Sequence, residues 1–267
     1  IMKNRSFIFT AVVASLLCVS CTKTQTTLSE NERPFNPPIM GWSSWNAFLV
    51  DISEDIIKHQ ADLMVEKGLK DAGYQYINVD DGYFGKRDEN GGRQANEKRF
   101  PNGMKPVADH IHSLGMKAGL YTDAGTRTCG SLWNKDSIGI GAGIYGHEPQ
   151  DAQLYFGDWG FDFIKIDYCG GEVLGLDEKE RYTSIRNSID KVNKNVSINI
   201  CRWAYPGTWA KDAATSWRIS GDINAHWNSL KYVVGKNLYL SAYAGNGHYN
   251  DMDMMVIGFR NNSRVGG

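Results

Sequence analysis

The feature that most constrains the fold is a mostly apolar strand that ends in a carboxylate. Residues 161–167 read Phe-Asp-Phe-Ile-Lys-Ile-Asp, so an apolar run interrupted by one lysine stops at Asp167. Two further strand-like runs also end at carboxylates, one at Asp80 and Asp81 and the other at Asp222. Barrels of parallel strands carry their chemistry at the carboxyl ends of the strands. Acids at three strand ends therefore favour a site that grips and cleaves a hydroxyl-rich molecule.

Strand-like and helix-like segments alternate along the chain, which is the pattern of βα units around a parallel sheet. The apolar spacing predicts helices over 53–72, 105–114, 150–159 and 176–192. Strands are expected over 39–45, 74–80, 116–122, 161–167, 196–201, 216–220 and 238–242. About seven units result, so we expect an α/β fold of the (β/α)8 barrel type that is truncated before its last unit. A doubly wound sheet is the alternative, but acids on so many successive strand ends favour the barrel.

The N-terminus has the pattern of an export signal. Lys3 and Arg5 precede an apolar run over 7–17 that is too short to span a membrane stably. The stretch ending at Cys21 resembles a bacterial lipoprotein signal, although Cys18 stands where leucine is usual, and an ordinary secretory signal is the alternative.

We therefore expect residues 1–21 to be a signal peptide with lipid attachment at Cys21. Residues 22–38 are polar and are expected to form a tether. This organisation predicts a lipoprotein of the periplasm or outer membrane of a Gram-negative bacterium, in contact with the membrane only through its lipid.

Composition and cysteine positions indicate which ligands and which disulfide can be expected. The formal net charge is -1, so nothing favours binding to nucleic acid. No His, Cys and carboxylate spacing typical of zinc appears, and neither a metal nor another cofactor is expected. In an exported protein one cysteine pair can form a disulfide; Cys129 and Cys169 each lie just past a strand end, which leaves Cys201 over. The sequence leaves the oligomeric state open.

Six motifs occur in the order of one enzyme family. They are GWSSWN at 41–46, VDDG at 79–82, LYTDAG at 120–125, KIDYC at 165–169, Trp217-Arg218 with Asp222, and GHYNDMDM at 247–254. Together they resemble glycoside hydrolase family 27, the α-galactosidase and α-N-acetylgalactosaminidase family. The resemblance implies a (β/α)8 catalytic barrel followed by a small antiparallel β-domain. Residues 39–267 are accordingly expected to be an incomplete barrel without that second domain.

The resemblance implies that Asp167 is the nucleophile and Asp222 the general acid/base. In a retaining glycosidase one carboxylate attacks the anomeric carbon and the other protonates the leaving oxygen, with the carboxyls about 5–5.5 Å apart. Lys165 shares a strand face with Asp167 and its charge is expected to keep that acid ionised. For an acid at a single strand end taken alone, a helix N-cap is the competing interpretation.

The resemblance also implies a galactose pocket. Asp80 and Asp81 match the pair that accepts hydrogen bonds from O4 and O6, with calcium ligation as the alternative for these two acids. The remaining matched substrate-binding residues are Trp45, Tyr121, Lys165, Trp203 and Arg218. The chain holds 8 Trp and 13 Tyr, whose flat rings suit the apolar faces of sugars as well as protein cores.

One motif departs from the family pattern. Relatives commonly carry Glu or Ser between the cysteine and the tryptophan of Cys201-Arg202-Trp203, where that residue helps select a 2-hydroxyl or a 2-acetamido group. Arg202 therefore has three possible roles: it donates to O2, recognises an acidic neighbouring sugar, or faces away in a salt bridge. The cysteine that pairs with this one in some relatives has no counterpart near Ser216, which leaves Cys201 unpaired.

The leading functional expectation is a retaining exo-α-galactosidase that removes terminal galactose from an oligo- or polysaccharide and prefers galactosides to N-acetylgalactosaminides. A β-L-arabinopyranosidase is the close alternative, because arabinopyranose shares the O2–O4 stereochemistry of galactose but lacks its hydroxymethyl group. The presence of both Asp80 and Asp81 favours galactose. A glycan-binding fragment without activity is the alternative of a different class.

Overall fold

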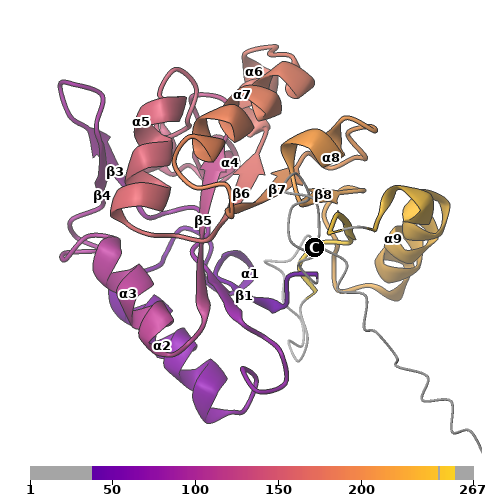
Figure 1. The fold of residues 1–267 in the computed structure, drawn as a ribbon, viewed down its shortest axis with the longest axis horizontal. Helices are drawn as coiled ribbons and strands as arrows, with labels where there is room; N and C mark the ends of the chain where they lie inside the picture. Colours follow the sequence, from indigo (N-terminus) through magenta and orange to yellow (C-terminus); the bar gives the residue numbers. More distant parts are fainter. Residues whose placement is uncertain (1–37, 246, 256–267) are drawn as a thin grey trace, which may run out of the picture. The chain divides into compact units, whose positions relative to one another are not determined.

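The computed structural model describes residues 38–245 and 247–255, which build one curved parallel sheet with helices on its outer side (Figure 1). The predicted signal peptide with its Cys21, and residues 22–37 of the predicted tether, lie outside the described residues.

The main sheet contains seven strands whose order in space is their order along the chain. They are β1 (Gly41–Ser43), β2 (Tyr76–Asn78), β5 (Lys117–Asp123), β6 (Phe163–Asp167), β7 (Ser197–Cys201), β8 (Ser216–Arg218) and β9 (Tyr249–Asp251). Every neighbouring pair is parallel. This order is that of a barrel and not of a doubly wound sheet, in which the strand order reverses. Within the described residues β1 and β9 each pair on one side only, so the predicted incomplete (β/α)8 barrel is confirmed.

The register of the central strands determines which side chains meet. Asp123 of β5 lies opposite Asp167 of β6, and Asp167 in turn lies opposite Cys201 of β7. These strands are apolar along most of their length, and their isoleucines and leucine are almost fully buried. Because all the strands run the same way, the polar residues that end them gather at one edge of the sheet.

Helices α2 (Glu54–Glu66), α3 (Lys105–Ser113), α5 (Glu148–Ala152) and α7 (Glu178–Asp190) cover the outer side of the sheet (Figure 1). The predicted N-cap of α2 is confirmed, because Ser53 Oγ accepts a hydrogen bond from the backbone N–H of Ile56 at 3.3 Å. This helix ends earlier than predicted, at Glu66, and Gly68 beyond it adopts a left-handed φ of 72°. A π-helical stretch, Gln153–Asp158, directly follows α5.

Short helices complete the units. They are α1 (Trp45–Phe48), α4 (Cys129–Trp133), α6 (Cys169–Val173) and α8 (Ala210–Ala213). Three of them, α1, α4 and α6, begin just after strand ends, and each contributes a residue to the site described below.

Two predictions about secondary structure are wrong or incomplete. The expected strand over 238–242 belongs instead to helix α9 (Trp227–Leu240) and a 3-10 turn (Ser241–Tyr243), and the seventh strand is β9. A short apolar run does not distinguish strand from helix. Sequence reasoning also missed the antiparallel hairpin of β3 (Phe84–Arg87) and β4 (Arg93–Ala95), whose turn contains Asn90-Gly91-Gly92.

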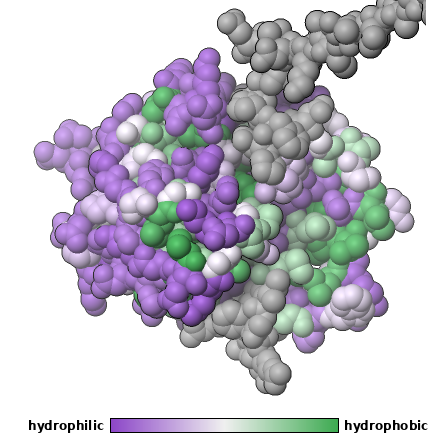
Figure 2. Space-filling view, turned by 60° about the horizontal axis from the view of Figure 1, so that its bottom comes forward, coloured by the Kyte–Doolittle hydropathy of each residue, from purple (hydrophilic) through white to green (hydrophobic). Residues whose placement is uncertain are grey.

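Helix α9 carries a group of exposed apolar side chains beside the open edge of the sheet. Its exposed large side chains are Trp227, Tyr232, Val234, Leu238 and Tyr239. Figure 2 shows hydrophobic residues gathered on the side of the molecule where α9 lies in Figure 1. None of the helices in the described segments is long and apolar enough to cross a membrane.

Candidate active site

A cavity of about 310 Å³ lies at the carboxyl ends of the strands. Eight of the predicted site residues line it together: Trp45, Asp80, Tyr121, Lys165, Asp167, Trp203, Arg218 and Asp222. All three described cysteines, Cys129, Cys169 and Cys201, line it as well. Asp81 and Arg202 are the two predicted substrate-binding residues that are not part of this lining. The structure thus brings most of the predicted set into one cavity, from strands spread over more than half of the chain.

Lys165 lies between the carboxylates of Asp80 and Asp167. Its Nζ atom is 3.0 Å from Asp80 Oδ2 and 3.9 Å from Asp167 Oδ2. Burial opposes the charged ammonium, but the two carboxylates outweigh it and hold the pKa of Lys165 well above its usual value. Burial raises the pKa of Asp167, and the nearby charge of Lys165 offsets only part of that rise. The sequence predicts the effect of Lys165 on Asp167 but not the larger effect of burial, which raises the pKa of Asp167.

Asp222 follows β8 and is held by Arg218. The Nη2 atom of Arg218 is 3.0 Å from Asp222 Oδ1, and the Asp222 side chain is 68% exposed whereas that of Arg218 is only 4% exposed. The same nitrogen is 3.0 Å from Asp253 Oδ2. Burial raises the pKa of Asp253 to about 6 in spite of this guanidinium. One buried arginine therefore binds an exposed and a buried carboxylate at once, and leaves Asp222 open to solvent.

Asp80 and Asp81 differ in surroundings although they are adjacent. Asp80 lines the cavity and accepts hydrogen bonds from Lys165 Nζ at 3.0 Å and from Ser43 Oγ at 3.3 Å. Asp81 accepts from the backbone N–H of Gly130 at 2.9 Å, and burial raises its pKa to about 7. Its Oδ1 atom is buried and has no hydrogen-bond partner in the described structure. Asp81 thus supports the start of α4 and retains one free acceptor.

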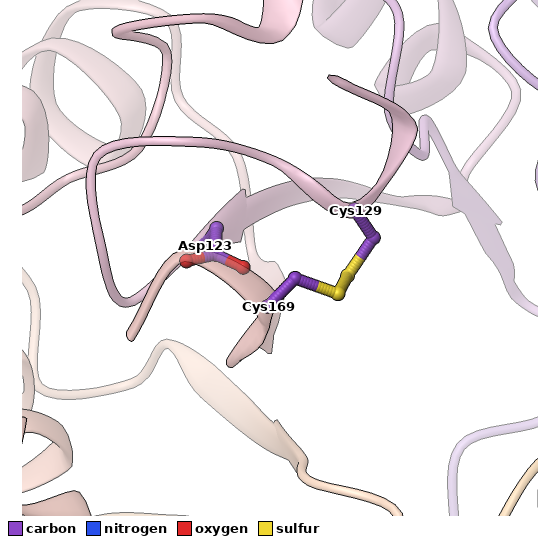
Figure 3. Close-up of side chains that lie close together, drawn as sticks. All are labelled: Asp123, Cys129 and Cys169. Carbon is purple, nitrogen blue, oxygen red and sulfur yellow. A yellow bond between two sulfur atoms is a disulfide. The ribbon is translucent and has the colours of Figure 1, made fainter. Parts of the chain in front are cut away.

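The predicted disulfide joins Cys129, at the start of α4, to Cys169, at the start of α6. Its Cα atoms are 5.2 Å apart, and the bond connects the loops that follow β5 and β6. Asp123 lies beside it, as Figure 3 shows, which groups three side chains of metal-binding type. Both sulfurs are used in the disulfide, and Asp123 Oδ1 accepts from the backbone N–H groups of Gly125 and Gly170 at 2.7 and 3.0 Å. The grouping is therefore structural.

Three cavity residues have strained backbones. Leu49 has a φ of 51°, Trp203 a φ of 37° and Asp253 a φ of 82°, all in the region of positive φ that side chains other than glycine rarely adopt. Such strain costs on the order of 1–3 kcal/mol and is concentrated at functional sites. Sequence reasoning did not single out Asp253, and the signal that points to it is its place in the GHYNDMDM motif. The neighbouring Met254 also lines the cavity and accepts a hydrogen bond from Asn46 Nδ2 at 3.2 Å through its carbonyl.

Arg202 is bound to Glu178 instead of facing the cavity. Its Nε atom donates to Glu178 Oε1 in a salt bridge, and its guanidinium lies 5.9 Å from the ring centroid of Tyr168. Of the three roles considered for Arg202, the structure shows the salt bridge. Arg202, a predicted substrate-binding residue, therefore lies outside the cavity lining, whereas the neighbouring Trp203 is part of it.

The chain also resembles known proteins over the same region. A sequence profile described as alpha galactosidase A matches residues 37–264. "Alpha-galactosidase A" of Cellvibrio japonicus is 38% identical over 96% of this chain and 63% of its own length. The alpha-galactosidase of Cyamopsis tetragonoloba is 41% identical over 86% of this chain and 54% of its own. The chain thus spans between half and two thirds of the length of these relatives.

Solved structures agree with this similarity. Alpha-galactosidase I from Mortierella vinacea superposes with a TM-score of 0.74 at 32% identity, over 83% of this chain and 60% of the other. The Saccharomyces cerevisiae alpha-galactosidase determined with raffinose gives a TM-score of 0.72 at 32% identity, over 81% of this chain and 52% of the other. Because the profile matches most of its length, the chain belongs to the alpha-galactosidase family, glycoside hydrolase family 27.

Proposed function

We propose that this chain is the catalytic part of a retaining exo-α-galactosidase that removes terminal galactose from oligo- or polysaccharides. The observation that carries the proposal is the cavity at the strand ends, which is lined by both Asp167 and Asp222. A cavity of about 310 Å³ is large enough to hold a sugar ring. The names of the relatives support the same activity.

In this proposal Asp167 is the nucleophile. Its carboxylate attacks the anomeric carbon, the glycosidic bond breaks, and a covalent glycosyl-enzyme forms. Asp167 is only 5% exposed, so the reacting oxygen is shielded from bulk water. Lys165 favours its ionised form against the effect of burial, which is the form that attacks.

Asp222 is the general acid/base. It gives a proton to the leaving oxygen in the first step and takes one from water in the second. Its side chain is 68% exposed, so a departing aglycone and incoming water can reach it. Arg218, which is buried, holds this carboxylate from the protein side.

Acceptors and rings around the cavity supply the sugar contacts. Asp80, with Lys165 already bound to it, is an acceptor for sugar hydroxyl groups in the cavity, whereas Asp81 next to it has its Oδ1 buried outside the lining. The indoles of Trp45 and Trp203 offer apolar surface to a sugar face. The presence of both Asp80 and Asp81 in the sequence supports galactose over arabinopyranose, which has no hydroxymethyl group.

We further propose that the protein is exported and held at a Gram-negative membrane by lipid on Cys21. The support is the order of basic residues, apolar run and cysteine over 1–21. Labelling cells with a tagged fatty acid tests this, since the parent protein should be labelled and Cys21→Ser should not. Labelling that survives the substitution would contradict the anchor.

The activity is tested with nitrophenyl α-galactoside, α-N-acetylgalactosaminide and β-L-arabinopyranoside. The chain is assayed as it stands, and also with its barrel closed by the C-terminal region of the Cellvibrio japonicus relative. The proposal predicts that the α-galactoside is cleaved best and that Asp167→Asn abolishes cleavage. For Asp222→Ala, substrates with poor leaving groups should suffer most, and azide should rescue the second step. Preference for the arabinopyranoside, or sugar binding without turnover in both forms, would overturn it.

A further inference from the structure

Cys201 is a buried cysteine that the proposed mechanism leaves without a task. It ends β7 directly opposite Asp167 at the end of β6, and it lines the same cavity. Its side chain is 2% exposed and forms no disulfide. A cysteine in this place is either a small apolar residue that fills space or a group that acts on its charged neighbours.

The contacts of the sulfur favour the second role. Arg218 Nη1 donates a hydrogen bond to Cys201 Sγ at 3.6 Å. Asp167 lies directly opposite Cys201 in the strand register, so the thiol and the carboxylate lie side by side at the ends of neighbouring strands. Because the sulfur accepts from Arg218, its own S–H is left to donate, and a carboxylate only accepts. The buried Oδ1 of Asp167 has no aligned donor among the described residues, so it offers the thiol a place to bind.

The sulfur also connects the two ends of the site. Arg218 binds Asp222 Oδ1 through Nη2 at 3.0 Å and Cys201 through Nη1. Hydrogen bonds therefore lead from Asp222 through Arg218 to Cys201, and Cys201 lies opposite Asp167 in the strand register. The other titratable groups near Asp167 lie on β5, on β6, after β2 and on α7: Tyr121, Asp123, Lys165, Asp80 and Tyr182.

We propose that Cys201 is a positioning residue for the nucleophile: its S–H donates to the Asp167 carboxylate while Arg218 fixes the sulfur, so that Asp167 and Asp222 are held as one unit. This role rests on the proposed function of the two acids. Burial, with the adjacent Asp167, raises the pKa of the Cys201 thiol well above its usual value, so the thiol keeps the proton that it must donate.

Matched substitutions separate this role from space filling. Cys201→Ser keeps a donor, Cys201→Ala removes the donor with a similar loss of volume, and Cys201→Val keeps the volume without a donor. We expect kcat of the Ser variant within about threefold of the parent, and a loss of roughly ten- to thirtyfold for both Ala and Val, since a hydrogen bond to a charged group is lost. The acid limb of kcat/KM should move to higher pH in Ala and Val but not in Ser.

A titration that needs no activity accompanies the kinetics. The side-chain ¹³C signal of Asp167, assigned with Asp167→Asn, is followed with pH in the parent and in the three variants. The proposal predicts a higher pKa for Asp167 in Ala and Val than in Ser. Ala and Ser behaving alike, or Val behaving like the parent, would show that Cys201 only fills space. Because the titration is independent of turnover, failure of the proposed function and failure of this inference remain distinguishable.

Discussion

Replacing Lys165 with methionine removes the positive charge between Asp80 and Asp167 while keeping much of the side-chain volume. The structure then leaves two buried carboxylates near each other without their counterion. Such a pair retains a proton more strongly than either acid does beside a cation. We therefore expect the Lys165→Met variant to lose the ionised nucleophile over the lower part of the pH range.

The distances set the size of the effect. Two unit charges 3.9 Å apart, as Lys165 Nζ and Asp167 Oδ2 are, attract by about 4 kcal/mol at an effective dielectric constant of about 20. The side chains of Lys165 and Asp167 are only 16% and 7% exposed, so solvent screens this attraction little. Since about 1.4 kcal/mol corresponds to a factor of ten, we expect kcat/KM to fall by about 10²–10³ on an aryl α-galactoside.

The assay is the pH profile of kcat/KM for the parent, Lys165→Met and Lys165→Arg. The methionine variant should show its acid limb at higher pH and recover part of its activity as pH rises, because a base must be ionised to act. The arginine variant keeps the charge and should stay within about tenfold of the parent. A methionine variant within tenfold of the parent, with its acid limb unmoved, would refute the view that Lys165 keeps Asp167 ionised.

Three further predictions concern stability and specificity. Replacing Cys129 and Cys169 together by serine should lower the free energy of unfolding by about 4 kcal/mol, from the chain entropy of a loop with a sequence separation of 40; a loss below about 1 kcal/mol in urea unfolding would contradict this. Arg202→Ala should leave galactoside kinetics within about twofold of the parent and lower the free energy of unfolding by about 1 kcal/mol, since it breaks only the partly exposed salt bridge to Glu178. A large kinetic loss would instead place Arg202 at the sugar. Burial raises the pKa of Asp123 to about 7, so the native state binds more protons than the unfolded chain, and the free energy of unfolding falls as pH rises from about 4 to about 7. Asp123→Asn should flatten that decline when it is measured by urea unfolding at several pH values. An unchanged slope would show that Asp123 does not cause the decline.

The parts of the fold that the sequence predicts well are those in which local pattern and tertiary structure agree. The strand that ends at Asp167 is apolar because both of its faces are covered, and its boundary falls where the buried run meets a polar residue. The run Leu238–Ala242 has a similar composition, yet it belongs to α9 and the 3-10 turn that follows, because a short apolar run does not by itself distinguish strand from helix. The β3–β4 hairpin is short and polar, so its glycine-containing turn is the main sequence signal that predicts it.

The site shows the same division. Residue types and order predict Asp167 and Asp222 as the candidate acids, and the structure places Asp167 at the end of β6 and Asp222 in the segment after β8. The environment of each group depends on packing that no motif contains. The larger effect of burial on Asp167, the salt bridge that occupies Arg202 and the contact of Cys201 with Arg218 all need the positions of neighbouring strands.

The central claim is that Asp167 forms the covalent intermediate, and trapping that intermediate tests it most directly. A fluorinated α-galactosyl fluoride combines a good leaving group with a ring fluorine that slows the second step, so the glycosyl-enzyme accumulates. The protein with its barrel closed is incubated with this reagent, digested and analysed by mass spectrometry. The account predicts one added fluorogalactosyl group on the side chain of Asp167, and none in Asp167→Asn. A label on another residue, or hydrolysis of galactosides with inversion of configuration and no label, would contradict it.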